Sequence, residues 1–355
     1  MVEINSAQPL IISCSPFYEG WQKLGPGLTA DEVQWVFYDD RPIYFWEKII
    51  RRPDVRILRA SIQAVICAMR GGTRLLITQE PRVSLYCALL CRLFQIQVNH
   101  YVNSLNFPEL PVGLRHRLMR FAFRQIAQFS VHSRMEKSLY SNYFDIPEER
   151  IRLRLWSIGM PTVHPDTPLQ PGQYVSSIGG NGRDYKTLLA ACQILSDVTF
   201  VLVVRPENLE GLEVPPNVRV LVNAKFEEAM NVLRHSRFMV LPLASSTVPC
   251  GHVTLVCAMH LGRTVVATDS AGISDYVFPG INGVMCEQSS PVSMAQAIDR
   301  LWKNPMEVAR LAENNRRFGA ENCSEACVRS DMASVLVDWD IPLQSTATSG
   351  RNDPI

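Results

Sequence analysis

The stretch that decides the fold runs from Ser176 to Leu189 and reads SSIGGNGRDYKTLL. A strand here enters a loop that contains Gly179, Gly180 and Gly182, and a helix follows. Glycine lets the backbone approach a ligand closely. The first N–H groups of the helix favour a phosphate, and the Arg183 guanidinium can bind one through two hydrogen bonds. The loop indicates either a phosphate site or an ordinary strand-to-helix turn with a surface arginine.

Strands and helices alternate on both sides of this loop. The predicted strands are 10–13, 33–38, 74–78, 97–102, 128–132, 152–155, 173–178, 199–204, 218–222, 238–241, 264–267 and 283–286. The predicted helices are 45–50, 61–69, 82–94, 113–127, 134–143, 185–195, 226–235, 253–261 and 293–302. This alternation is typical of parallel strands with crossover helices on both faces. We predict an α/β protein with two Rossmann-like, doubly wound parallel-sheet domains that face each other across a cleft.

A proline-rich run divides the chain. Residues 160–172 read MPTVHPDTPLQPG and have no hydrophobic period, which is typical of a linker. We assign residues 1–160 to an N-terminal Rossmann-like domain, 161–172 to the linker and 173–320 to a C-terminal Rossmann-like domain. Residues 321–355 are expected to form a C-terminal helix and a disordered tail.

Composition excludes several classes of protein. The 355 residues are 47% hydrophobic and 19% charged, with a net charge of +1, so neither a disordered chain nor a dedicated nucleic-acid binder is expected. The start of the chain lacks a signal-peptide pattern, and no apolar run is long enough to span a bilayer. The ten cysteines include no C-x-x-C pair and favour free thiols, so we predict a cytoplasmic protein.

A second loop enters a helix at residues 248–259, which read VPCGHVTLVCAM. Gly251 would permit a close approach, and the N–H groups of His252 and Val253 would point toward the cleft. The His252 ring either hydrogen-bonds a phosphate or sugar hydroxyl, or it caps and packs the helix.

Taken in order with residues 261–283, these segments resemble the C-terminal domain of retaining glycosyltransferases with the GT-B fold, of the group 1, family 4-like type. The matching features are the glycine turn with its helix, Ala258-Met259 before Gly262, and Asp275-Tyr276-Val277 before Gly280-x-Asn-Gly. The resemblance is specific over about residues 174–305. It implies transfer of a hexosyl-type sugar from a nucleotide-sugar to a sugar, glycan or lipid-linked acceptor.

The resemblance also implies a donor site without metal or organic cofactor. Departure of the donor diphosphate would be stabilised by Arg183, Lys186 or Lys225 and by helix N-termini. The candidate catalytic residues are Arg183, Lys186 and His252. The candidate phosphate ligands are the glycines at 179, 180, 182 and 251, together with Arg183, Lys225, His252, Val253 and Thr254.

One departure from the family pattern concerns two carboxylates. The family carries two glutamates, with seven residues between them, that approach the donor sugar and the ribose; Pro249 and Cys257 stand at those positions here. An impaired nucleotide-binding relative is therefore a second hypothesis. A sugar-nucleotide epimerase of the same fold is a third, although it would need acid–base carboxylates that we do not identify.

Acceptor contacts are expected from the N-terminal half. Glu80 and Asn106 follow predicted strands and either bind acceptor hydroxyls or serve as a helix cap and a turn. The segment Gly113–Phe129 interleaves four arginines with apolar residues. It predicts either peripheral contact with an anionic membrane or an ordinary sheet-covering helix.

Overall fold

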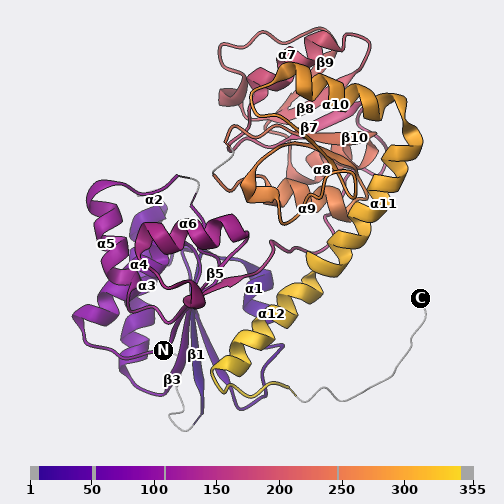
Figure 1. The fold of residues 1–355 in the computed structure, drawn as a ribbon. Helices are drawn as coiled ribbons and strands as arrows, with labels where there is room; N and C mark the ends of the chain where they lie inside the picture. Colours follow the sequence, from indigo (N-terminus) through magenta and orange to yellow (C-terminus); the bar gives the residue numbers. More distant parts are fainter. Residues whose placement is uncertain (1–7, 50–52, 108, 246–247, 345–355) are drawn as a thin grey trace.

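The computed structural model describes residues 8–49, 53–107, 109–245 and 248–344. They form two domains, each built on a parallel sheet, as Figure 1 shows. The predicted C-terminal tail from residue 346 onward lies outside the described residues. The observed architecture confirms the predicted fold class.

The N-terminal sheet has the strand order β2-β1-β3-β4-β5-β6. Its strands are β1 (Leu10–Cys14), β2 (Gln34–Tyr38), β3 (Thr73–Thr78), β4 (His100–Val102), β5 (Gln128–Val131) and β6 (Ile151–Leu153). Its helices are α1 (Glu19–Leu24), α2 (Phe45–Ile49), α3 (Pro53–Met69), α4 (Pro81–Leu93), α5 (Gly113–Phe123) and α6 (Arg134–Phe144). Alternate residues of β1 and β3 point to opposite faces, so Ile12 and Leu76 pack under α3 and α4.

The C-terminal sheet has the order β12-β11-β10-β7-β8-β9. Its strands are β7 (Val175–Ile178), β8 (Phe200–Val204), β9 (Val218–Val222), β10 (Phe238–Leu241), β11 (Val265–Thr268) and β12 (Val284–Cys286). Its helices are α7 (Tyr185–Ile194), α8 (Phe226–His235), α9 (His252–His260), α10 (Pro291–Lys303) and α11 (Pro305–Asn322). Two apolar cores, one on each face of the sheet, hold these helices in place.

The last helix, α12 (Glu325–Asp338), returns to the N-terminal domain. In Figure 1 it runs from the end of α11 down along the N-terminal sheet. Met332, Val335 and Leu336 are buried in one cluster with Ile11 and Tyr101. The second face of the N-terminal sheet is therefore covered by residues from the far end of the chain.

Several predicted elements were wrong in extent. α3 begins at Pro53 rather than at 61, because Arg59 turns inward to the buried Glu47 instead of breaking the apolar face. α5 ends at Phe123, since Ile126 N bonds Phe123 O and the chain tightens into a turn before β5. The strand predicted at 97–102 is reduced to His100–Val102. α1 and α11 were missed, and α11 buries few apolar side chains along its length.

We expect the core contact of α12 to be essential for stability. Leu336→Ala should lower the free energy of unfolding by about 2–5 kcal/mol, since Leu336 is 0% exposed and truncation leaves a cavity. The matched control is Val337→Ala, because Val337 is 57% exposed and should change stability by less than about 0.5 kcal/mol. Denaturant unfolding of both variants measures the difference; equal midpoints would show that α12 is not part of the core.

Candidate functional site

The glycine loop after β7 lies against the segment that follows β10. Gly179 has a φ of +116°, and a Cβ there would lie 2.8 Å from Nη2 of Arg183. Ala244 N donates to Gly182 O at 3.0 Å, and Asp184 N donates to Pro242 O at 3.0 Å. The two carboxyl-edge loops are thus joined by backbone hydrogen bonds.

Arg183 lies half-buried between these loops without a carboxylate. Its guanidinium donates to Asn181 O at 2.9 Å, to Ile178 O at 3.4 Å and to Oγ1 of Thr254 at 3.3 Å. No ion pair within the described ranges includes Arg183, and burial lowers its pKa. Because a buried cation is costly without an anion, this arrangement suits a negatively charged ligand.

The N-terminus of α9 is open beside Arg183. Gly251 precedes the helix with a φ of +91° and no side-chain cap, and the first intrahelical bond runs from Leu255 N to Gly251 O at 2.9 Å. The N–H groups of His252, Val253 and Thr254 precede that bond, so they carry the positive end of the helix dipole. Thr254 Oγ1 accepts from Arg183, so the predicted juxtaposition of these two loops is present.

The N-terminus of α7, in contrast, is already capped. The Asp184 carboxylate accepts hydrogen bonds from Thr187 N at 3.0 Å and from Thr187 Oγ1 at 2.6 Å. This cap fills one of the first N–H groups, so α7 offers a phosphate fewer free N–H groups than expected. A second anion there would meet an acidic side chain.

Arg205 adds a second guanidinium to the glycine loop. It follows β8 and donates to Oδ1 of Asn181 at 3.0 Å, while a Cβ on Gly180 would lie 2.8 Å from its Cδ. Asn208 Nδ2 donates to Gly180 O at 2.8 Å and fixes the loop from the same side. Sequence reasoning placed Arg205 only within a loop, because no motif marks a lone arginine after a strand.

The two candidate lysines stand apart from this cluster. Lys186 is exposed in the first turn of α7, and Lys225 is exposed where α8 begins. Among the described residues, no hydrogen bond or ion pair links either side chain to Arg183 or to α9. The structure gathers Gly179, Gly182, Arg183 and Thr254 but not these lysines.

The His252 ring takes the packing role. Its Nε2 atom donates to Gly272 O at 2.8 Å, and its ring lies 4.9 Å from that of Tyr276. Burial lowers the pKa of His252, so the ring is neutral near pH 7. With Nε2 already engaged, the backbone N–H of His252 is the better phosphate donor of the two.

A buried polar contact joins the two domains. Both oxygens of Asp275 accept from Arg134, one from its backbone N at 2.7 Å and one from Nη1 at 2.6 Å. The Tyr276 hydroxyl donates to His132 O at 2.6 Å and accepts from Trp156 N at 2.8 Å. Because both of its oxygens are engaged by Arg134, Asp275 does not substitute for the missing donor-binding glutamates.

The two acceptor-side candidates, Glu80 and Asn106, differ in their hydrogen bonding. Glu80 follows β3; its Oε1 atom bonds Arg82, while Oε2 is buried without a hydrogen-bond partner in the described structure. Asn106 donates through Nδ2 to Oε1 of Glu136 at 3.0 Å. Glu80 therefore keeps an unfilled acceptor atom, whereas the Asn106 amide group supports a buried carboxyl.

Cys257 and Pro249 occupy the positions where the family carries glutamates. Cys257 is 0% exposed in the C-terminal core, and burial raises its pKa to about 12. Pro249 is buried against Gly272, with its Cα 3.0 Å from a Cβ placed there. Pro249 and Val248 also border a cavity of about 130 Å³ with Phe107, Leu110, Leu139 and Tyr140 of the N-terminal domain. The lining of this cavity between the domains is mainly apolar.

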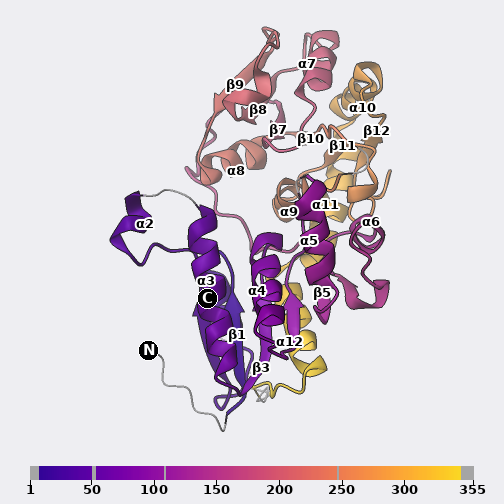
Figure 2. The same ribbon diagram turned by 90° about the vertical axis from the view of Figure 1, so that its left-hand side faces the viewer.

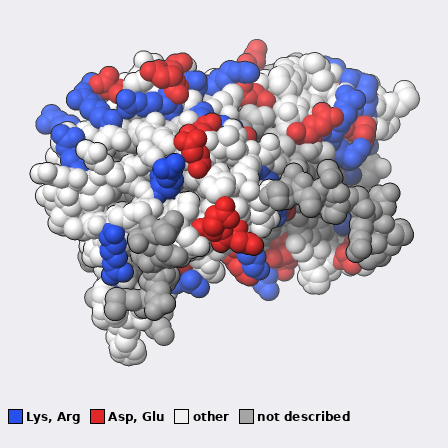
Figure 3. Space-filling view, turned by 90° about the horizontal axis from the view of Figure 1, so that it is seen from below, with Lys and Arg blue, Asp and Glu red and all other residues white. Residues whose placement is uncertain are grey.

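A larger cavity, of about 490 Å³, opens at the opposite edge of the N-terminal sheet. Its lining includes Thr73, Arg74, Asn99 and His100, at the amino ends of β3 and β4. Figure 3 views the molecule from this end and shows acidic and basic side chains interspersed. Ligands of open parallel sheets bind at the carboxyl ends of the strands, so this cavity is separate from the candidate site.

The comparisons with known proteins concern the segment that contains these residues. Residues 173–304 match the sequence model of the family described as Glycosyl transferases group 1, a range that covers β7 to α10. An uncharacterized glycosyltransferase of Methanocaldococcus jannaschii is 27% identical over 112 residues, which are 32% of this chain and 31% of that protein. The resemblance stated from the motifs is thus confirmed at the level of group 1 for this segment, about a third of the chain.

Solved structures match over almost the whole chain. Sucrose-phosphate synthase from Thermosynechococcus elongatus has a TM-score of 0.68 at 15% identity, covering 93% of this chain and 98% of that one. The HepE protein of Anabaena, in complex with UDP and glucose, has a TM-score of 0.69 at 15% identity, covering 93% and 99%. These likenesses establish the GT-B fold.

The Glu136 carboxyl generates a pH prediction. It accepts from His132 N at 2.9 Å and from Ser133 Oγ at 3.1 Å, and burial raises its pKa to about 7. Because the pKa is higher in the folded protein, the contribution of Glu136 to the free energy of unfolding is complete below the pKa that Glu136 has in the unfolded chain. This contribution is lost as the pH rises through 7, by on the order of 3 kcal/mol.

Glu136→Gln removes this titration while keeping an acceptor for Ser133. We expect the free energy of unfolding of the native protein to fall relative to that of the variant between pH 5 and pH 8. Urea unfolding at several pH values measures both. Parallel pH profiles would contradict a raised pKa at Glu136.

Proposed function

We propose that the chain is a glycosyltransferase that binds a nucleotide-sugar at the C-terminal carboxyl edge. The observation that carries the proposal is Arg183, a half-buried cation without a carboxylate, held against the open N-terminus of α9. A diphosphate supplies the charge that this arrangement lacks. The group 1 match over residues 173–304 and the GT-B fold support the same assignment.

In the proposed reaction, the bond between the anomeric carbon and the diphosphate breaks and an acceptor oxygen bonds to that carbon on the same face. The acceptor proton passes to the departing diphosphate. Negative charge develops on the diphosphate, where Arg183, Arg205 and the first N–H groups of α9 are already oriented. No metal is needed in this scheme, because cationic side chains and N–H groups carry the stabilisation.

The acceptor is proposed to enter from the N-terminal domain. Glu80, with its unpartnered Oε2, would bind an acceptor hydroxyl at the carboxyl end of β3. The mainly apolar cavity beside Pro249 favours an acceptor that carries apolar groups, such as a lipid-linked sugar, over a free polar sugar. Hexosyl transfer with retention remains part of the proposal.

Peripheral membrane contact through Gly113–Phe129 is also a proposal. Leu114 and Phe121 of α5 are exposed, but Arg120 and Arg124 both pair with Asp145. Only Arg115 and Arg117 of the four arginines keep an exposed side chain outside the ion pairs of the described residues.

Donor binding is tested with UDP first, since HepE structures hold UDP and UDP-glucose, and then with GDP, ADP and dTDP and their sugars. Arg183→Ala should weaken the affinity for the preferred diphosphate by roughly tenfold or more, the range expected for a charged hydrogen-bonding group. Arg316→Ala, on the exposed face of α11, is the matched control and should bind like the native protein. Isothermal titration calorimetry gives the dissociation constants.

Three outcomes separate the hypotheses. Release of nucleoside diphosphate that depends on an acceptor supports transfer. Conversion of the nucleotide-sugar into an isomer without such release favours an epimerase, and tight binding with neither reaction favours a nucleotide-binding relative. Failure of all four nucleotide classes to bind would sink the donor-site proposal itself.

A further inference from the structure

A group of exposed apolar side chains projects from the N-terminal domain at α2. Phe45 is 78% exposed, Ile49 66% and Ile43 60%, and the rings of Tyr44 and Trp46 stack on each other with centroids 5.9 Å apart. Figure 2 shows α2 standing out to one side of α3 rather than packing on the sheet. Exposed apolar groups of this size mark an interaction surface.

The projecting segment is held firmly from beneath. The Glu47 carboxylate is buried and accepts from Ile43 N at 2.7 Å, Tyr44 N at 3.1 Å and Arg59 Nε at 2.7 Å. Burial works to raise the pKa of Glu47, but these donors outweigh it and the pKa is lowered. An ionised, fully engaged carboxylate therefore fixes the turn that displays the apolar side chains.

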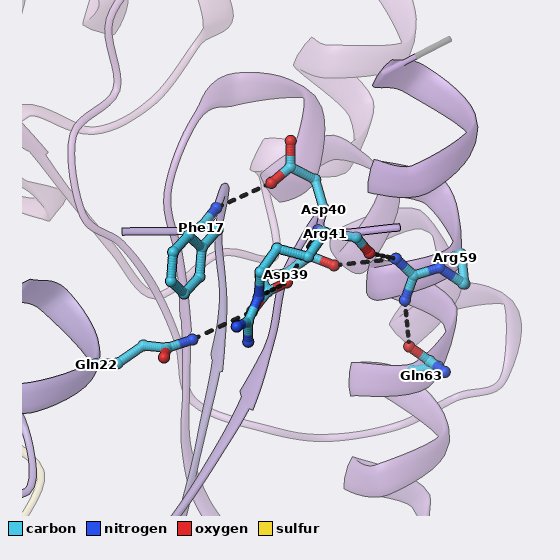
Figure 4. A network of polar contacts seen from close by, with 7 residues as sticks. All are labelled: Phe17, Gln22, Asp39, Asp40, Arg41, Arg59 and Gln63. Carbon is cyan, nitrogen blue, oxygen red and sulfur yellow. Dashed lines mark hydrogen bonds and ion pairs between the residues drawn. The ribbon is translucent and has the colours of Figure 1, made fainter. Parts of the chain in front are cut away.

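Arg59 extends this support to the residues before α2. Its guanidinium donates to Arg41 O at 2.8 Å, to Asp39 O at 3.3 Å and to Oε1 of Gln63 at 3.0 Å. Asp39 in turn pairs with Arg41, and Asp40 accepts from Phe17 N at 2.9 Å, as Figure 4 shows. Because buried polar groups hydrogen-bond the backbone of this segment, its exposed apolar side chains are held in a fixed conformation.

Exposed apolar side chains continue on α3, the next helix. Leu58, Ile62, Ile66 and Met69 recur at helical spacing and are 39–53% exposed. Together with residues 43–46 and Ile49, they form what we call the α2–α3 apolar surface. Arg56 lies on α3 and Arg70 directly follows it, and neither takes part in an ion pair among the described residues. Arg70 is exposed, so the surface combines apolar and aromatic groups with a cation that has no acidic partner within the described chain.

We propose that the α2–α3 apolar surface docks on a bilayer that contains anionic lipids. Trp, Tyr and Phe side chains are stable at the headgroup boundary, where their rings leave water and their polar atoms do not. The exposed Arg70, directly after Met69, complements anionic headgroups. Phe45, Trp46 and Ile49 of α2 are exposed and can enter a bilayer, whereas Glu47 is buried beneath them.

Docking here would place the membrane beside the candidate acceptor side. α2 follows β2, so it stands at the carboxyl edge of the N-terminal sheet, the edge from which Arg134 contacts the C-terminal domain. This orientation rests on the proposed function, since it brings a lipid-linked acceptor toward Glu80. The docking itself does not, and it is measured without donor or acceptor.

The experiment is flotation of the full chain with vesicles of phosphatidylcholine alone and of phosphatidylcholine with roughly 30 mol% phosphatidylglycerol, a composition that gives an anionic surface. We expect the native protein to float with the anionic vesicles. The double variant Phe45→Ser/Ile49→Ser should lower the partition coefficient by at least about tenfold, because it removes two exposed apolar groups. Tryptophan emission, to which Trp46 and the other five tryptophans of the chain contribute, should shift to the blue with anionic vesicles and should not shift in that variant.

Two matched controls keep the test specific. Met306→Ser removes an apolar side chain that is 83% exposed on α11, and it should float like the native protein. Leu114→Ser/Phe121→Ser alters α5; loss of flotation in this variant alone would overturn the proposal in favour of α5. Thermal melts of each variant exclude unfolding as the cause.

The remaining outcomes also count against the proposal. Equal flotation of the native protein and Phe45→Ser/Ile49→Ser would overturn it, as would no flotation at all. A native dimer that becomes monomeric in Phe45→Ser/Ile49→Ser, without vesicle binding, would reassign the surface to a second copy of the chain. Donor titration of Phe45→Ser/Ile49→Ser should match that of the native protein, which separates failure of docking from failure of the proposed function.

Discussion

The contact between Asp275 and Arg134 sets the relation of the two domains. Both oxygens of a buried carboxylate are used across the interface, and Tyr276 adds a hydroxyl that bridges His132 and Trp156. Removing the Arg134 side chain, which is itself 79% exposed, would leave the buried Asp275 carboxylate with only the backbone N of Arg134 as donor. The facing edges, the inter-domain cavity and the acceptor side are defined relative to each other by this contact.

At the proposed donor site, the positive groups have no carboxylate partner among the described residues. Arg183 and Arg205 bond neutral acceptors, and Gly251 leaves α9 uncapped, whereas α7 is closed by its own aspartate. The N-terminus of α7 is therefore capped within the protein, whereas that of α9 has no side-chain cap. Pro249 and Cys257 contribute no carboxylate here, so the two arginines meet no negative charge from these positions.

The sequence was most informative where local chemistry determines local structure. Strand and helix alternation predicted the two sheets, and the two glycine-containing loops were both assigned to one phosphate site, where Arg183 contacts Thr254. Contacts between residues far apart in the chain carry no such local signal, so the engagement of Asp275 by Arg134 and of His252 by Gly272 was not predicted. The inward turn of Arg59 toward Glu47 likewise reads as a surface arginine until the fold is known.

The return of α12 to the N-terminal sheet has a consequence for how the protein is made. Ile11, Leu75, Ile77 and Tyr101 of the first domain are covered by Met332, Val335 and Leu336, which leave the ribosome only after the second domain has been synthesised. One apolar face of the N-terminal sheet therefore stays partly uncovered through most of translation. Folding of the N-terminal domain is completed by α12, the last helix to be synthesised. A truncated nascent chain therefore exposes an apolar surface that chaperones recognise.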